Sequence, residues 1–170
     1  TIYVLAALHF FCGDYGKALR LYEEIIELNP AYRGAYQLKG FALSMLGRPE
    51  EALEVLQEYR ALVNHPLKGL TCLTLVHHFL GNTEAAADCV ARMYQRLEEE
   101  PTVAAEIDLA LITAGLGQFD KSIYHLNRVY DQRYSIACTG VLWILRCPYF
   151  FELWQQPGYK KLLDRMGLER

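Results

Sequence analysis

Four short segments of the chain share one pattern: GDYGKA at 13–18, GRPEEA at 47–52, GNTEAA at 81–86 and GQFDKS at 117–122. Each begins with glycine, continues through polar residues and ends five positions later on alanine or serine. The first three glycines are spaced by 34 residues, and the fourth follows after 36. A glycine with a short polar stretch behind it is typical of the end of one helix and the start of the next. The repeat therefore predicts a series of helix pairs.

The sequence on both sides of each turn has a helical pattern. Apolar segments of about a dozen residues precede the glycines, at 2–12, 35–46, 67–80 and 103–116. More charged segments follow the turns and keep one apolar stripe at spacings of three and four, as in Ala18, Leu21, Tyr22, Ile25 and Leu28. No segment alternates with a period of two, so we expect no sheet. The predicted fold class is all-α, a stack of antiparallel helix pairs.

The composition fits one domain or a short repeat array of 170 residues. Apolar residues make up 52% of the chain, and the mean hydropathy is +0.02, which is typical of a folded protein. The net charge of −3 argues against a surface for nucleic acid. The chain contains no run of eighteen apolar residues, so we expect no membrane-spanning helix. The apolar segment at 2–11 lacks the flanking residues of a signal peptide. We therefore expect a cytoplasmic protein. Because the chain opens inside a helix and without methionine, we also expect it to be a piece of a longer protein.

The repeat resembles the tetratricopeptide repeat (TPR), on three groups of residues. The first group holds the small residues expected where the two helices of a pair cross: Ala6, Gly40, Thr74 and Ala110. The second holds small residues at the next helix contact: Ala18, Ala52, Ala86 and Ser122. The third holds the larger residues four positions later: Tyr22, Leu56, Val90 and Leu126. The resemblance implies an α-solenoid of about four TPR-like repeats in residues 1–134, at 1–30, 31–64, 65–100 and 101–134.

Residues 135–170 have a different pattern. Two prolines, Pro148 and Pro157, stand where short helices would begin, and Gly167 stands where the second would end. We expect these C-terminal helices to cap the last repeat, because the end of a solenoid exposes an apolar face. The segments 148–150 and 157–168 are also similar to the C-terminal ends of TPR regions in bacterial multidomain transcriptional regulators and adenylate cyclases. That resemblance implies a role in signal transduction or transcription regulation, with the output in a domain upstream.

No pattern of residues indicates catalysis. Gly13 to Lys17 lacks the spacing of a phosphate loop. The neighbouring His77 and His78 point in different directions on a helix, and His9 with Cys12 has no second pair of metal ligands. The five cysteines are odd in number and lie in apolar runs, so we expect buried, reduced thiols. We predict no enzyme, no metal and no cofactor.

Function is then expected on the concave face, which the first helices of the repeats line. The repeat register assigns eleven residues to it: Tyr3, Phe10, Gln37, Phe41, Ser44, Lys68, Thr71, Leu75, His78, Ile107 and Leu111. This lining is apolar and aromatic, and Lys68 alone cannot hold a peptide's terminal carboxylate. It suits a helix or an extended apolar peptide. The predicted function is a non-catalytic protein–protein interaction module whose partner is another protein, a peptide or another domain of the same parent chain.

Two alternatives remain open. The chain could be an oligomerisation element that forms a homodimer through the ends of the array, because the apolar opening helix would expose one face. It could also be a small-ligand sensor with a pocket near Trp143, Trp154 and His125.

Overall fold

The computed structural model describes residues 2–63, 69–132, 144–145 and 147–168. Within these residues the chain is helical and contains no strand, which confirms the predicted all-α fold. The chain divides into two compact units, Thr1–Cys89 and Val90–Arg170. The division falls inside the third predicted repeat, whereas the boundary predicted at residue 134 lies outside the described residues. No described helix combines the length and apolar character needed to span a membrane.

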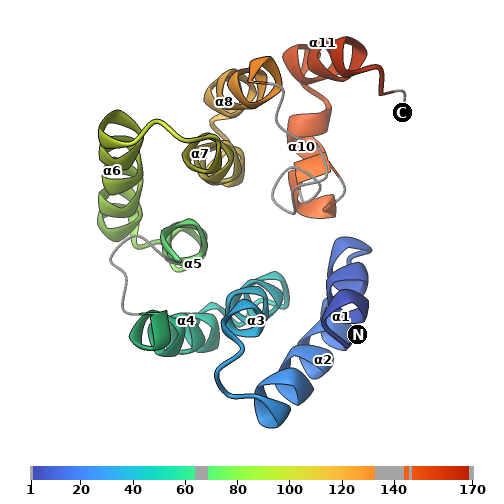
Figure 1. Ribbon diagram of the computed structural model, residues 1–170, viewed down its shortest axis with the longest axis vertical. Helices are drawn as coiled ribbons and strands as arrows, with labels where there is room; N and C mark the ends of the chain where they lie inside the picture. The colour runs from blue at the N-terminus through green and yellow to red at the C-terminus, as the bar shows by residue number, and fades with distance from the viewer. Residues whose placement is uncertain (1, 64–68, 133–143, 146, 169–170) are drawn as a thin grey trace. The chain divides into compact units, whose positions relative to one another are not determined.

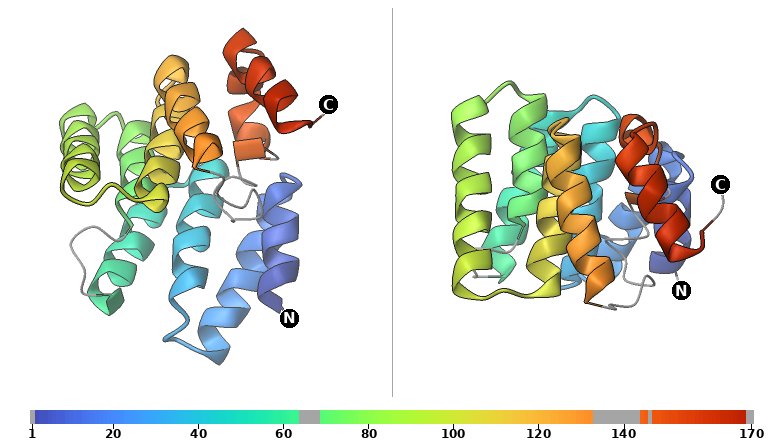
Figure 2. Two further views of the ribbon diagram at one scale, coloured as in Figure 1. Left: turned by 45° about the horizontal axis from the view of Figure 1, so that its top comes forward. Right: turned by 90° about the horizontal axis from the view of Figure 1, so that it is seen from above.

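Unit 1 is built from antiparallel helices that follow one another along the chain (Figures 1 and 2). Its helices are α1 (Ile2–Phe11), α2 (Tyr15–Leu28), α3 (Arg33–Met45), α4 (Pro49–Val63) and α5 (Leu70–Phe79), and α6 (Thr83–Glu99) begins in it. Each of the helices α1 to α4 packs against the next one, and α3 also contacts α5 and α1. The first helices of successive repeats thus lie beside one another, as the repeat predicts.

The four predicted turns share one hydrogen-bond pattern. Each turn glycine has a left-handed backbone, with φ between 71° at Gly117 and 81° at Gly13. The residue after the glycine donates its N–H to the carbonyl five residues back, as Arg48 does to Leu43 at 3.0 Å. The same residue's carbonyl accepts the first bond of the next helix, from Ala52 at 3.1 Å. The remaining turns repeat both bonds at Asp14, Asn82 and Gln118. A left-handed φ strains any residue that carries a Cβ, so glycine fits this position.

The small residues of the repeat lie at helix crossings, and all of them are buried. In the second repeat, a Cβ on Gly40 would stand 2.9 Å from both Cγ and Cδ2 of Leu56, so α3 and α4 touch at this glycine. In the fourth repeat, Ser122 replaces the usual alanine, and its hydroxyl donates to the Ala110 carbonyl at 2.8 Å. The crossing is therefore maintained by contact in one repeat and by a hydrogen bond in the other.

Unit 2 holds the last helix pair and its cap. It contains α7 (Val103–Gly115), α8 (Phe119–Asp131), a 3₁₀ turn η1 (Pro148–Phe150), α10 (Phe151–Trp154) and α11 (Pro157–Met166). Pro157 begins α11 and the left-handed Gly167 ends it, as predicted. The apolar stripe of α11 is buried at Tyr159, Leu162 and Leu163, and α11 packs against α8. Residues 157–166 therefore cap the last described pair.

The contact between α11 and α8 is also polar. Tyr130 donates its hydroxyl to the Arg165 carbonyl at 2.5 Å, and the Arg165 guanidinium pairs with Asp131 at 2.7 Å. The guanidinium also donates to the Asn127 side chain and lies over the Tyr130 ring, 4.9 Å from its centre. These bonds place the end of α11 beside the end of α8.

The cysteines differ in part from the prediction. Cys72, Cys89 and Cys147 are buried, as expected, whereas Cys138 lies outside the described residues. Cys12 is exposed, so the prediction of a buried thiol is wrong there. Cys12 lies one residue beyond the end of α1, in the turn at Gly13, rather than on a buried helix face.

Replacing Gly40 by alanine is expected to destabilise the protein by about 1–3 kcal/mol, because the new methyl group overlaps Leu56 at the α3–α4 crossing. Chemical denaturation followed by circular dichroism measures this loss. Gly16→Ala is the matched control: it adds a methyl group in α2 where nothing lies within 4 Å, and we expect it to stabilise by about 0.5 kcal/mol. Equal effects of the two substitutions would contradict the close crossing.

Candidate functional site

The residues predicted to line the concave face fall into three rows on the first helices. The rows follow the repeat spacing of 34 residues, or 36 at α7. They are Tyr3, Gln37, Thr71 and Ile107; Phe41, Leu75 and Leu111; and Phe10, Ser44 and His78. All ten lie on α1, α3, α5 or α7, as expected for lining residues. The eleventh, Lys68, lies outside the described residues.

Most of these side chains are buried. Leu75 has no exposed surface, and Phe10 and Phe41 are each 1% exposed. The other buried members are Ser44, Thr71, Ile107 and Leu111. Only three of the ten described residues have appreciable surface: Tyr3 and Gln37 are half-buried and His78 is exposed. The accessible part of the predicted lining is therefore aromatic or polar and uncharged apart from the imidazole.

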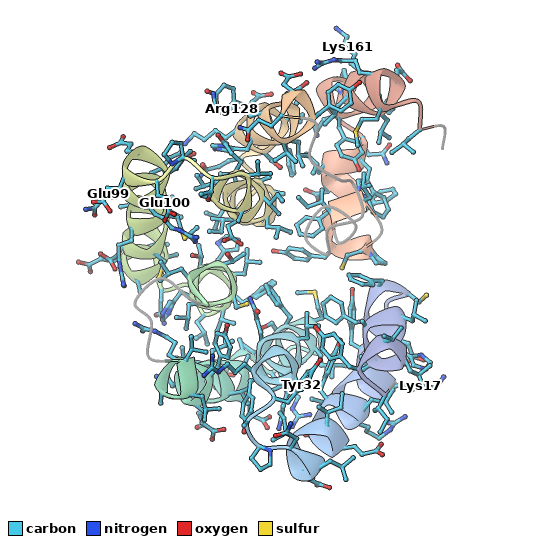
Figure 3. All side chains as sticks on the ribbon, viewed as in Figure 1. Lys17, Tyr32, Glu99, Glu100, Arg128 and Lys161 are labelled. Atoms are coloured by element: carbon cyan, nitrogen blue, oxygen red, sulfur yellow. The ribbon has the colours of Figure 1, made fainter. Side chains whose placement is uncertain are left out.

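Tyr3 belongs to a cluster of three tyrosines in unit 1. Its ring centre lies 5.3 Å from that of Tyr32 and 6.3 Å from that of Tyr22. Figure 3 shows Tyr32 at the connection between α2 and α3. Burial raises the pKa of Tyr3, and the nearby Tyr32 raises it further. Burial also raises the pKa of Tyr22, whose buried hydroxyl has no hydrogen-bond partner among the described residues. The phenols of Tyr3 and Tyr22 thus stay neutral near pH 7, and the half-buried Tyr3 and exposed Tyr32 offer aromatic surface and hydroxyl groups.

The histidines and cysteines do not assemble into a metal site within the described chain, where no group of three or more potential ligands occurs. His9 Nδ1 lies 3.5 Å from Asp14 Oδ2. His78 packs near Phe79, with ring centres 6.3 Å apart. Nδ1 of His77 is buried and makes no hydrogen bond to any described residue.

Unit 2 contains a buried polar network that the sequence pattern does not predict. Glu106 on α7 is 1% exposed, and its Oε2 lies 2.6 Å from Nδ1 of His125 on α8, which is 2% exposed. Arg128 Nε donates to the other carboxylate oxygen of Glu106. The second ring nitrogen of His125 lies 3.2 Å from the Tyr94 hydroxyl on α6. These four side chains connect the C-terminal half of α6 with α7 and α8.

The network resembles a catalytic relay in its order of carboxylate, imidazole and hydroxyl, but its electrostatics oppose that role. Burial, aided by the charge of Glu106, raises the pKa of Tyr94, so the hydroxyl keeps its proton. The hydrogen bond that Arg128 donates to Glu106 raises the pKa of Arg128, which therefore stays cationic and balances the buried carboxylate. We interpret the network as a structural link between helices.

The signal for this network was present in the sequence. Glu106 is an acidic residue within the apolar run that becomes α7, and His125 follows Ser122 on the buried stripe of α8. An acid and a base that both face the core are expected to pair, because an isolated buried charge is costly. The helical period alone does not place one opposite the other.

Comparisons with known proteins agree with this architecture. Residues 13–66 match the family model described as tetratricopeptide repeat. A stretch of 53 residues is 47% identical to an uncharacterized protein of Methanocaldococcus jannaschii and spans 31% of this chain and 62% of that protein. The fold is similar to TPR-like repeats from Podospora anserina, with a TM-score of 0.52 and 16% identity over 98% of this chain and 92% of that one. These findings support a TPR protein.

A structure of a variant of the same fungal repeats gives the same TM-score and identity, and the match covers 91% of that chain. At this identity the likeness concerns the fold alone. The family match ends at residue 66, so it covers the first turn and the α3–α4 pair, whereas the likeness of fold extends over nearly the whole chain. The TPR pattern thus has support from sequence in unit 1 and from fold beyond it.

Leu75→Glu is expected to unfold the α5 region, since it places a carboxylate in a fully buried position at a cost of several kcal/mol. His78→Glu, on the exposed face of the same helix, should leave stability within about 0.5 kcal/mol of the parent. Helical circular dichroism during thermal unfolding separates the two. A Leu75→Glu protein as stable as the parent would contradict the burial of this row.

Glu106→Ala is expected to destabilise by about 3 kcal/mol, because it removes the acceptor shared by His125 and Arg128 in a buried site. Asp108→Ala is a matched control on the same helix. Asp108 is partly exposed and pairs with Arg96 at 3.7 Å, so its loss should cost less than about 1 kcal/mol. Urea denaturation gives both values, and a Glu106 effect no larger than the Asp108 effect would refute the structural role.

Proposed function

We propose that this chain is a non-catalytic interaction module that binds a helix or an extended peptide of a partner protein along the first helices of its repeats. TPR repeats generally mediate protein–protein interaction, and the match of residues 13–66 to this family is the observation that carries the proposal. In unit 1 the helix pairs stack so that the first helices α1, α3 and α5 lie beside one another, which makes a continuous row of side chains. A segment that lies along this row could contact several repeats at once.

The accessible residues favour a neutral partner. None of the ten described lining residues carries a formal charge at neutral pH, with histidine taken as neutral. Tyr3 and Gln37 occupy the same row in successive repeats, and His78 is exposed on α5. Tyrosine supplies apolar area with a hydroxyl at its edge, and glutamine supplies both a donor and an acceptor for a peptide backbone. This chemistry suits an apolar or neutral segment rather than a terminal carboxylate.

The oligomerisation element and the small-ligand sensor, the two alternatives raised by the sequence, remain predictions. His125 was one of the residues expected near a small-ligand pocket, and both of its nitrogens now have protein partners. Trp154 donates its indole N–H to the Ile144 carbonyl at 2.8 Å, and Trp143 lies outside the described residues. No observation in this part of the chain favours a sensor. The place of the module in a bacterial transcription or signalling regulator and its cytoplasmic location also stay predictions.

A photo-crosslinking amino acid at position 37 is expected to capture the partner in cells that produce the full protein. The same amino acid at Gln57, exposed on the second helix α4, serves as the matched control and should capture little. Mass spectrometry of the crosslinked species identifies the partner and the segment bound. Capture from position 57 alone, or equal capture from both positions, would refute binding along the first helices.

A further inference from the structure

The fourth repeat differs from the other three at one pair of helix positions. The counterparts of Glu106 and His125 lie 36, 70 or 104 residues earlier in the chain. They form three apolar pairs with the same spacing of 19 residues: Ile2 with Leu21, Tyr36 with Val55, and Leu70 with Cys89. The repeat register thus places an apolar pair at this point in three repeats and a carboxylate with an imidazole in the fourth.

Stability alone does not explain this exchange. Glu106 is 1% exposed and His125 is 2% exposed, so both polar groups lie out of water. At such a site a well-packed apolar pair of similar volume is often as stable as an ionic pair, or more stable. What the carboxylate provides beyond an apolar residue is an acceptor for Nε of Arg128. The feature that distinguishes the fourth repeat is thus a guanidinium held by a buried acid.

Arg128 reaches from this buried acid to the surface of α8 (Figure 3). Its side chain is 44% exposed, whereas Glu106 is buried, so a partner would meet the cationic end of the pair. Because Glu106 accepts from Nε, the terminal amino groups of the guanidinium remain for the hydroxyl of Tyr124 and for further acceptors. A side chain that is already held in place loses little conformational entropy when it binds.

The ring of Tyr124 lies beside this guanidinium, with Cζ of Arg128 5.8 Å from its centre, and Tyr124 is 58% exposed. This exposure does not come from an end of the chain. The counterparts of Tyr124 in the first three repeats are Arg20, Glu54 and Asp88, and all three are exposed. Glu54 lies on α4, which packs against a first helix on both sides, α3 and α5. The position is therefore on the solvent face of the second helices, and the fourth repeat alone carries an aromatic ring there.

We propose that Tyr124 and Arg128 bind an acidic side chain of a partner protein, with the guanidinium held in place by Glu106. Guanidinium and carboxylate pair through strong, charge-assisted hydrogen bonds, and a single carboxylate matches the single cation. The Tyr124 ring offers apolar area for the residue next to that carboxylate, and tyrosine and arginine are enriched among the residues that dominate binding at interfaces. This surface is on a second helix, whereas the proposed function uses first helices, so the two can fail independently.

Two end-blocked peptides, Gly-Leu-Glu-Leu-Gly and Gly-Leu-Gln-Leu-Gly, test the site on the whole chain. NMR titration followed on the backbone amides of α8 should show that the glutamate peptide binds about tenfold more tightly, because only its carboxylate can pair with the guanidinium. The amides around Arg20 on α2, an exposed arginine with no ion-pair partner among the described residues, are the reference and should shift little. Equal affinities of the two peptides, or equal shifts around both arginines, overturn the proposal.

NMR of the free protein tests whether Glu106 holds Arg128. The Nε–H of Arg128 should exchange with water about tenfold more slowly than the Nε–H of Arg20, since it donates to a buried carboxylate. Equal exchange rates would mean that the guanidinium is not held, and the proposal would fail.

Substitutions at the surface separate the ring from the charge. Tyr124→Ala should weaken binding of the glutamate peptide about fivefold, whereas Glu54→Ala, at the equivalent position of α4, should leave it unchanged. Arg128→Lys keeps the charge that balances Glu106 but loses the planar fork, so the preference for the glutamate peptide should fall to about twofold or less. Circular dichroism must show the parent's helicity for all three variants, which is expected because all three side chains lie at the surface. Parental affinity in Tyr124→Ala, or a full preference in Arg128→Lys, overturns the proposal.

Discussion

The structure depends on one backbone constraint, a left-handed glycine that ends each first helix. At Gly13, Gly47, Gly81 and Gly117 the chain adopts a positive φ, which lets the next residue donate its N–H five residues back and accept the first bond of the following helix. One residue thus closes a helix and opens its antiparallel neighbour within a few positions. Because the same turn recurs at nearly the same spacing, the helix pairs recur as well, and in unit 1 the first helices α1, α3 and α5 lie side by side.

The turn sets the direction of the second helix, and small residues set its distance. Gly40 lets Leu56 approach until no Cβ would fit between them, and Ser122 uses its hydroxyl to hold the carbonyl of Ala110. Close crossings bury both helices of a pair deeply, so that Phe41 and Leu75, on the face expected to be open, are almost inaccessible. The surface left for a partner is consequently a narrow one on the first helices.

Much of this could be predicted from the sequence, since periodicity determines which residues share a helix face. The apolar runs at 2–12 and 103–116 form α1 and α7, and each helix ends one residue before its run does. The C-terminal helix α11 begins at Pro157 and is ended by Gly167, as predicted. Periodicity does not determine how deeply each side chain is buried. Phe10 and Phe41 share the lining register with the half-buried Tyr3 and Gln37 but are themselves buried, whereas Cys12, which ends an apolar run, is exposed. The pairing of Glu106 with His125 joins two helices across 19 residues and depends on their relative rotation, which spacing alone does not give.

Hydrogen exchange of four backbone amides tests the central constraint most directly. Asp14, Arg48, Asn82 and Gln118 lie at surface turns, and each donates its N–H to a carbonyl five residues back at 2.8–3.0 Å. The account predicts that NMR will find all four amides protected, at levels close to those of the adjoining helices. Exchange of these amides at the rate of an unstructured loop would mean that the glycine turns do not form, and the repeated architecture would lose its basis.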